Sequence, residues 1–152
     1  MAHWGEYGMD MKWHYTMGIK LRSIMEDGVI KPATARVPQG EKPVVWFSTN
    51  QEWEPTANKS WQNSDGQIMI GDKDKTAELG LGLVRIGVEP DTAPYDWHTI
   101  KKASGMSGKM ANGLYRVGID CGSRPGDWWE PSSQFRVEVS LKVLWVPFER
   151  EG

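Results

Sequence analysis

The fold is decided by residues 13–30, which read Trp13-His14-Tyr15-Thr16-Met17-Gly18-Ile19-Lys20-Leu21-Arg22-Ser23-Ile24-Met25-Glu26-Asp27-Gly28-Val29-Ile30. The first four residues are typical of a short strand that ends in histidine and threonine. A helix is predicted next, because four apolar residues have the spacing of one helical face: Met17, Leu21, Ile24 and Met25. We expect the Thr16 hydroxyl to cap this helix, and Gly28 to end it in the left-handed conformation before a second strand at 29–30.

This arrangement predicts that His14 lies at the rim of a sheet, beside free backbone N–H groups at a helix N-terminus. Such groups attract anions, so the pattern favours a nucleotide-like ligand. A neutral imidazole can also bind a ribose hydroxyl or a phosphate oxygen without changing its protonation. The alternative is a purely structural histidine. His3 and His98 have no partner nearby in the sequence, and we expect both at the surface.

The composition describes an ordinary globular chain with an unusual number of tryptophans. It has 152 residues and a net charge of −2, from 18 basic and 20 acidic side chains, which gives no overall attraction to nucleic acid or membrane. Cys121 has no second cysteine to pair with, so we expect a cytoplasmic protein. No apolar run has membrane-spanning length, and no signal peptide is recognisable. The nine tryptophans indicate a flat-walled pocket in addition to a core.

The order of the predicted elements favours an α+β fold. Residues 1–10 show no periodicity and are predicted to form a flexible leader, so a single domain would cover 11–152. Strands are expected at 44–49, 68–70, 83–88 and 114–119, and residues 135–139 and 142–148 are expected to form one long strand or two short ones. We expect a helix from the Asp91-Thr92-Ala93-Pro94 start to about residue 104, a capped turn or short helix at 50–59, and a loop at 31–43 that serves as a lid or faces a ligand. Two or three short helices that do not alternate regularly with strands are typical of α+β proteins.

The motifs of several common enzyme classes are absent. The chain has no Gly-rich phosphate loop, no dinucleotide fingerprint after a strand, no zinc-protease helix and no serine-hydrolase elbow. One cysteine and three dispersed histidines also make no metal site. Kinase, Rossmann, zinc-hydrolase and serine-hydrolase functions are therefore not predicted.

Three further positions are candidates for chemistry. Ser48 and Thr49 end the most apolar strand, where their hydroxyls either bind a ligand or cap the following turn. Glu130 follows two tryptophans and precedes a proline, so its carboxylate is expected to be partly desolvated and suited to act as a base. The alternatives are that Glu130 is a solvated loop residue, or that Glu138 on the later strand takes this role.

These residues together resemble the ADP-ribosyltransferase superfamily, in its His–Tyr–Glu branch and the related DNA-targeting toxins and RNA 2′-phosphotransferases. The likeness rests on the His-x-Thr strand end at 14–16, the helix with Leu21 and Ile24, and Gly28. The strand at 44–49 is similar to the second family motif, with Trp46-Phe47-Ser48 where the branch usually has tyrosine. The third motif is a glutamate near the penultimate strand, either Glu130 or Glu138.

The resemblance implies a split β-sheet fold that binds NAD as a substrate. His14 would bind the nicotinamide-side ribose, and Thr16 the adenosine half or a phosphate. Trp46 or Phe47 would stack on nicotinamide, and Ser48 would support the glutamate. Tyr15 and Thr49 complete the implied NAD site. Glu130 would bind the ribose 2′-hydroxyl, stabilise the cationic transition state and help to deprotonate the acceptor; no metal is needed.

The implied function is transfer of ADP-ribose from NAD to a protein or nucleic acid, or hydrolysis of NAD, of the kind found in toxin, phage and defence proteins. One alternative is a non-catalytic module that binds NAD, ADP-ribose or another nucleotide. Another is an interaction protein whose exposed tryptophans contact a partner. Replacing the glutamate separates the first two, and NAD titration separates both from the third.

Overall fold

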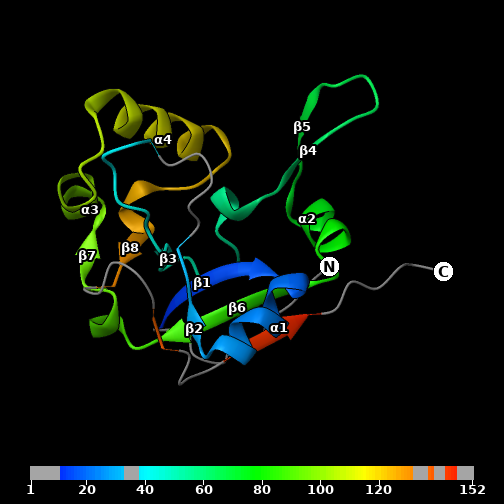
Figure 1. Cartoon of the computed structure of the whole chain (residues 1–152), viewed down its shortest axis with the longest axis horizontal. Coiled ribbons are helices and arrows are strands. Elements are labelled where there is room, and N and C mark those ends of the chain that lie inside the picture. Colours follow the sequence, from blue (N-terminus) through cyan, green and yellow to red (C-terminus); the bar gives the residue numbers. More distant parts are fainter. Residues whose placement is uncertain (1–10, 33–37, 132–136, 139–142, 147–152) are drawn as a thin grey trace.

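An antiparallel sheet of short and long strands organises the chain (Figure 1). The computed structural model describes residues 11–32, 38–131, 137–138 and 143–146. Its largest sheet has six strands, in the order β10 (Val143–Val146), β6 (Leu83–Val88), β1 (Lys12–Met17), β3 (Phe47–Ser48), β8 (Trp128–Glu130) and β7 (Tyr95–Asp96). Together with four α-helices in the described ranges, this confirms the α+β class. The predicted leader at 1–10 lies outside these ranges.

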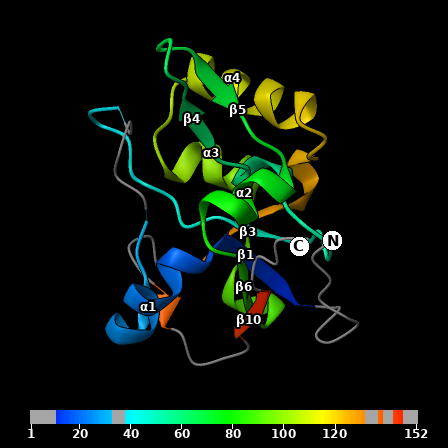
Figure 2. The same cartoon turned by 90° about the vertical axis from the view of Figure 1, so that its right-hand side faces the viewer.

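The six-stranded sheet consists of two halves that meet at one residue pair. β1 pairs with β6 along its whole length, from Lys12 to Met17. Between β1 and β3, only Trp13 and Ser48 are paired. β3 then continues the second half by pairing with β8. Figure 2 shows α3 and α4 on one side of β3, and α1, β6 and β10 on the other.

Residues 13–30 form the predicted strand, helix and strand, with one correction at the start of the helix. α1 (Gly18–Asp27) ends at Gly28, whose φ of 68° is left-handed as expected, and β2 (Val29–Ile30) follows. The predicted Thr16 cap is wrong, because the strand runs on to Met17, which is the N-cap and makes no side-chain bond to the helix. Two of the predicted apolar positions, Leu21 and Ile24, pack against the core. Met25 is exposed.

The remaining elements surround this unit. The helices are α2 (Lys73–Leu79), α3 (Trp97–Ala103) and α4 (Gly108–Asp120), with 3₁₀ turns η1 (Pro55–Ala57), η2 (Pro90–Thr92) and η3 (Pro125–Asp127). Two small sheets pair β2 with β9 (Val137–Glu138), and β4 (Ser60–Gln62) with β5 (Ile68–Ile70). The β4–β5 hairpin projects from the body of the molecule (Figure 1).

Several predicted elements differ from the structure. The strand expected at 114–119 is wrong, because these residues lie inside α4. The helix expected from Asp91 begins instead at Trp97, after η2 and β7, and Asp96 caps it by accepting from the Thr99 amide. The sequence analysis missed α2, and the strand at 44–49 is limited to Phe47–Ser48. Within the expected C-terminal strands, 137–138 and 143–146 are extended as predicted.

Apolar side chains pack on both faces of the first half-sheet, which consists of β10, β6 and β1. One face carries Val84, Ile86 and Val88, which join Phe47 and Ile30 in a buried cluster. The opposite face carries a second cluster: Met11, Trp13, Tyr15, Trp53, Ala77 and Leu83. Because successive strand residues point to opposite faces, His14 and Thr16 lie on the first face while Trp13 and Tyr15 fill the second.

No helix in the part of the chain that the structure describes is long and apolar enough to cross a membrane.

Candidate functional site

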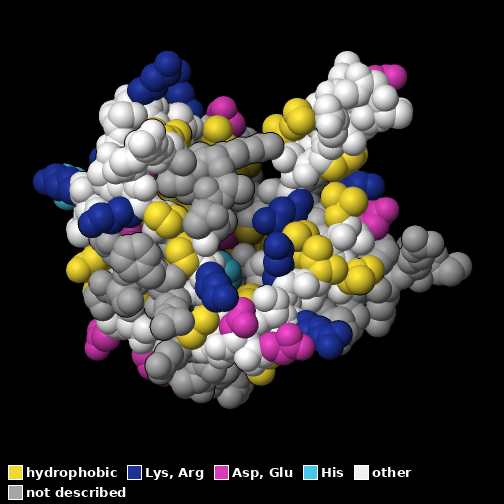
Figure 3. Space-filling view, in the orientation of Figure 1, with side chains coloured by type: hydrophobic (Ala, Val, Ile, Leu, Met, Phe, Trp, Pro, Cys, Tyr) yellow, Lys and Arg dark blue, Asp and Glu magenta, His cyan; other side chains and the backbone are white. Residues whose placement is uncertain are grey.

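A cavity of about 680 Å³ lies where the two half-sheets separate. One wall comes from β1, α1 and β2, and the other from β3, η1 and α4. Its volume is in the range of small-molecule binding sites. Figure 3 shows a hollow in which a histidine side chain lies between lysine or arginine side chains. Six of the predicted site residues line the cavity: His14, Tyr15, Thr16, Trp46, Phe47 and Ser48.

The His14 ring is held in one orientation by the opposite wall. Its Nδ1 lies 2.8 Å from the main-chain oxygen of Trp46. A carbonyl oxygen only accepts hydrogen bonds, so Nδ1 carries the proton and Nε2 is left as an acceptor. Burial lowers the pKa of His14, the bond to Trp46 opposes this, and the charge of Lys59 lowers the pKa further. The ring is therefore neutral near pH 7 and offers an acceptor to a ligand hydroxyl.

The start of α1 differs from the expected anion site. His14 is the third residue of a six-residue strand, not its end. The first two helix amides are already used, because Gly18 and Ile19 donate to the carbonyl oxygens of Gly82 and Gly80, both at 2.9 Å. These two amides are therefore not available to an anion in the cavity.

Aromatic rings form part of the second wall. Trp46 meets Trp128 edge to face, with ring centroids 5.9 Å apart, and Trp97 contacts both. Phe47 packs against the His14 ring at 5.8 Å. Trp128 is pressed against α4, since a Cβ added at Gly118 would lie 2.4 Å from the Trp128 ring. These contacts fix the positions of the rings that line the cavity.

Two of the predicted site residues do not line the cavity. Thr49 donates to Asp127 Oδ1 at 2.8 Å and closes the turn after β3. Glu130 is 1% exposed, and its Oε2 has no hydrogen-bond partner among the described residues. Burial raises the pKa of Glu130 to about 7, so the expected desolvation is present at a position outside the cavity. The Glu138 backbone pairs with Val29, and its side chain lies outside the described part of the chain.

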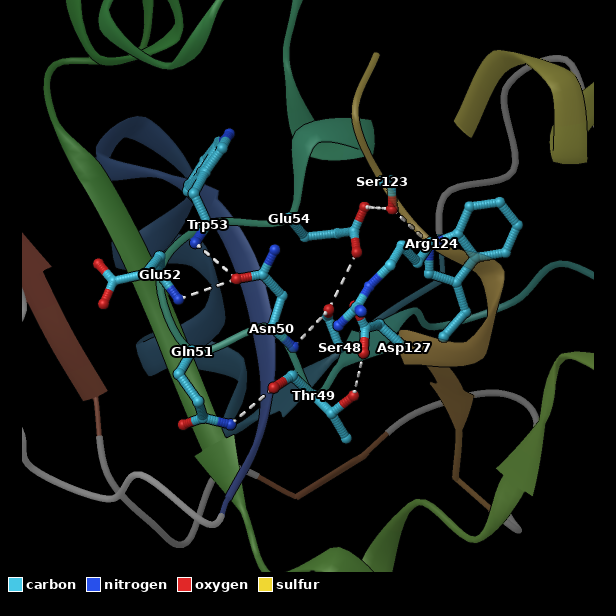
Figure 4. A network of polar contacts seen from close by, with 11 residues as sticks. Ser48, Thr49, Asn50, Gln51, Glu52, Trp53, Glu54, Ser123, Arg124 and Asp127 are labelled. Carbon is cyan, nitrogen blue, oxygen red and sulfur yellow. Dashed lines mark hydrogen bonds and ion pairs between the residues drawn. The ribbon is translucent and has the colours of Figure 1, made fainter. Parts of the chain in front are cut away.

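A different carboxylate, Glu54, lines the cavity, and the sequence analysis missed it. It is 6% exposed and is fixed by three hydroxyls, of which Figure 4 shows those of Ser48 and Ser123. Ser48 donates to Oε1 at 2.9 Å, while Ser123 and Thr56 donate to Oε2 at 2.6 and 2.7 Å. The Thr56 amide adds a fourth bond at 3.1 Å. Charge-assisted bonds of this kind hold a carboxylate in place.

A signal for Glu54 was present in the sequence. Trp53-Glu54-Pro55 repeats the pattern of Trp129-Glu130-Pro131, a glutamate between a tryptophan and a proline. The expected support of a glutamate by Ser48 is also found, although the glutamate is Glu54 and not Glu130.

The cavity has a cationic side. Lys20, Lys31 and Lys59 line it together with the carboxylates of Asp27 and Glu54. Lys31 forms an ion pair with Asp27 at 3.2 Å. In the described ranges, no group of three or more histidine, cysteine or acidic side chains is arranged to hold a metal ion.

Comparisons with known proteins found no match: no family model matches the sequence, no curated protein is similar to it, and no solved structure has a matching fold. The function is therefore argued from the cavity itself.

Proposed function

We propose that the chain is a cytoplasmic ADP-ribosyltransferase that uses NAD as its substrate and belongs to the split-sheet superfamily that its sequence resembles. The observation that carries the proposal is the cavity between the half-sheets. It brings His14 and Thr16 of the first motif together with Trp46, Phe47 and Ser48 of the second. These two motifs are about thirty residues apart in the sequence, and their convergence on one cavity is what the family likeness requires.

His14 and the aromatic wall would position the nicotinamide half of NAD. The free Nε2 of His14 would accept a hydrogen bond from a hydroxyl of the nicotinamide-side ribose. Trp46 or Phe47 would stack on the nicotinamide ring, which is cationic before the reaction and is attracted to the face of an aromatic ring.

Glu54 would provide the carboxylate that the transfer reaction needs. The bond between ribose C1′ and nicotinamide nitrogen breaks, and its electron pair leaves with nicotinamide. The ribose becomes an oxocarbenium-like cation, which a fixed negative charge stabilises. A hydroxyl, amine or ring nitrogen of a protein or nucleic acid then bonds to C1′ and loses a proton; with water as the acceptor, the reaction is NAD hydrolysis. Glu54 is held by Ser48, Thr56 and Ser123 for this electrostatic role.

The test combines NAD binding with release of nicotinamide. Binding is followed by tryptophan fluorescence, and turnover by chromatography of nicotinamide with water, protein and oligonucleotide acceptors. We expect His14→Asn, which preserves a donor to Trp46 but removes the Nε2 acceptor, to weaken binding about tenfold. The matched control is His98→Asn, at an exposed position of α3, and this variant should bind NAD with the affinity of the wild type.

The glutamates are compared in the same assays. Glu54→Gln should bind NAD and lose about 10²–10³-fold in turnover, whereas Glu130→Gln should retain both. Glu54→Asp, checked by near-ultraviolet circular dichroism, is the second variant if the amide disturbs folding. Saturable binding without nicotinamide release would favour the non-catalytic NAD-binding module. Absence of NAD binding by the folded wild type would contradict the proposal.

A further inference from the structure

The cationic side of the cavity contains a pair of lysines that the reaction described above does not use. Lys20 lies in the first turn of α1, and Lys59 follows η1 on the opposite wall. Both line the same cavity, although 39 positions separate them in the sequence. Figure 3 shows lysine or arginine side chains beside the hollow.

Neither lysine has an acidic partner among the described residues. The cavity carboxylates are engaged elsewhere, because Asp27 pairs with Lys31 and Glu54 accepts from hydroxyls. None of the ion pairs between described residues includes Lys20 or Lys59. Burial lowers the pKa of Lys59, and the positive charge of Lys20 lowers it further. The two ammonium groups therefore repel one another across the cavity.

No ion pair between described residues offsets this repulsion. Two like charges that line one cavity reduce the stability of the empty protein, and an anion between them would reverse the effect. A diphosphate fits this need, because it carries roughly one negative charge on each phosphate. Lysine ammonium groups are also common phosphate ligands.

We propose that Lys20 and Lys59 form a diphosphate-binding subsite, which takes the linkage between the two halves of a dinucleotide or the phosphates of a nucleoside diphosphate. This inference rests on the proposed function for the identity of the dinucleotide as NAD, but the diphosphate subsite stands on the lysine pair alone. It would place the diphosphate between the wall of α1 and the segment after η1, next to His14.

The experiment measures both affinity and stability. ADP-ribose, ADP, AMP, adenosine and inorganic pyrophosphate are titrated by calorimetry, and each is tested for its effect on Tm. The variants are Lys20→Met and Lys59→Met, which keep the apolar length of the side chain. Lys102→Met, at an exposed position of α3 outside the cavity, is the matched control.

We expect ADP-ribose, ADP and pyrophosphate to bind the wild type, AMP to bind more weakly and adenosine to bind least. Each cavity variant should lose about tenfold in affinity for ADP and little for adenosine. Without ligand, the same variants should have a Tm equal to or about 2 °C above that of the wild type, because they remove a repulsion. The control should change neither quantity.

The outcomes separate this inference from the proposed function. Lysine-dependent binding of ADP and pyrophosphate without NAD binding would support the subsite and contradict the transferase. NAD binding that both lysine variants retain would overturn the subsite and leave the transferase intact. Equal affinity of ADP and adenosine for the wild type would also overturn the subsite.

Discussion

The Nδ1 atom of His14 lies 2.8 Å from the main-chain oxygen of Trp46, so a side chain of β1 is bonded to the residue that precedes β3. This bond crosses between the two half-sheets, and both residues line the cavity. It fixes both the tautomer and the orientation of the ring, which leaves the second ring nitrogen for a ligand.

The first prediction concerns the protonation of His14. Its pKa is lowered by burial, so as the pH falls below about 6.5 the unfolded chain takes up this proton before the folded one. The stability contributed by neutral His14 is therefore complete above this pH and is lost below it. Between about pH 7.5 and pH 5, the Tm of His14→Asn should fall less than the Tm of the wild type. Thermal melts across this pH range measure it, and an equal fall in Tm for the two proteins would contradict the prediction.

The second prediction concerns Glu130, whose pKa is raised to about 7 by burial. An acid with a raised folded pKa contributes stability that is complete below its unfolded value, near 4.5, and is lost as the pH rises through 7. Glu130→Gln should therefore have a Tm close to that of the wild type at about pH 4.5 and an increasing advantage up to about pH 8. A constant difference across this range, measured by differential scanning calorimetry, would show that the carboxylate does not titrate as described.

The third prediction uses two glycines of α4. A Cβ at Gly118 would meet the Trp128 ring at 2.4 Å, whereas a Cβ at Gly113 would have no neighbour within 4 Å. Gly118→Ala should cost about 1–3 kcal/mol in the free energy of unfolding and displace a wall of the cavity. Gly113→Ala should stabilise the protein by up to about 1 kcal/mol, because alanine is the better helix former. Urea unfolding measures both, and equal effects would contradict the packing of α4 on Trp128.

The fourth prediction tests the support of Glu54. Ser48→Ala removes the bond to Oε1 at 2.9 Å and also the acceptor of the Asn50 amide. We expect a loss of about 1–3 kcal/mol in stability, because buried polar groups are left without a partner. If Glu54 is catalytic, the variant should also lower turnover more than it weakens NAD binding. Thr49→Val, which removes a bond to Asp127 outside the cavity, is the control.

The opening strand, helix and strand could be predicted because local signals agree there. The apolar spacing at Leu21 and Ile24 and the glycine at Gly28 specify the same helix. α4 could not be predicted in this way. Tyr115, Val117 and Ile119 alternate with Arg116 and Gly118 as in a strand, yet all three are exposed on the helix. Its buried residues are instead Ala111 and Gly118, seven positions apart, and such small residues give little hydrophobic signal.

The candidate site was predicted where it depends on neighbours in the sequence and not where it depends on tertiary contacts. His14, Thr16 and Trp46 belong to segments whose pattern already indicated a ligand, and they line the cavity. The choice between Glu54 and Glu130 depends on tertiary contacts: Glu54 precedes η1 and accepts from Ser123, 69 positions away, whereas Glu130 is buried on β8. No local pattern contains that information.

The pairing of Trp13 with Ser48 has a mechanical consequence for the whole domain. Among the described residues it is the single ladder pair between the two half-sheets, and Gln51, after β3, reinforces the same end through bonds to both Trp13 and Met11. The two half-sheets are thus joined at this pair and separate at the cavity. Any molecule that contacts both walls adds a further cross-link between the two half-sheets, beside the His14–Trp46 bond and the buried cluster that Phe47 shares with Ile86. Its binding should sharpen the unfolding transition as well as raise its midpoint.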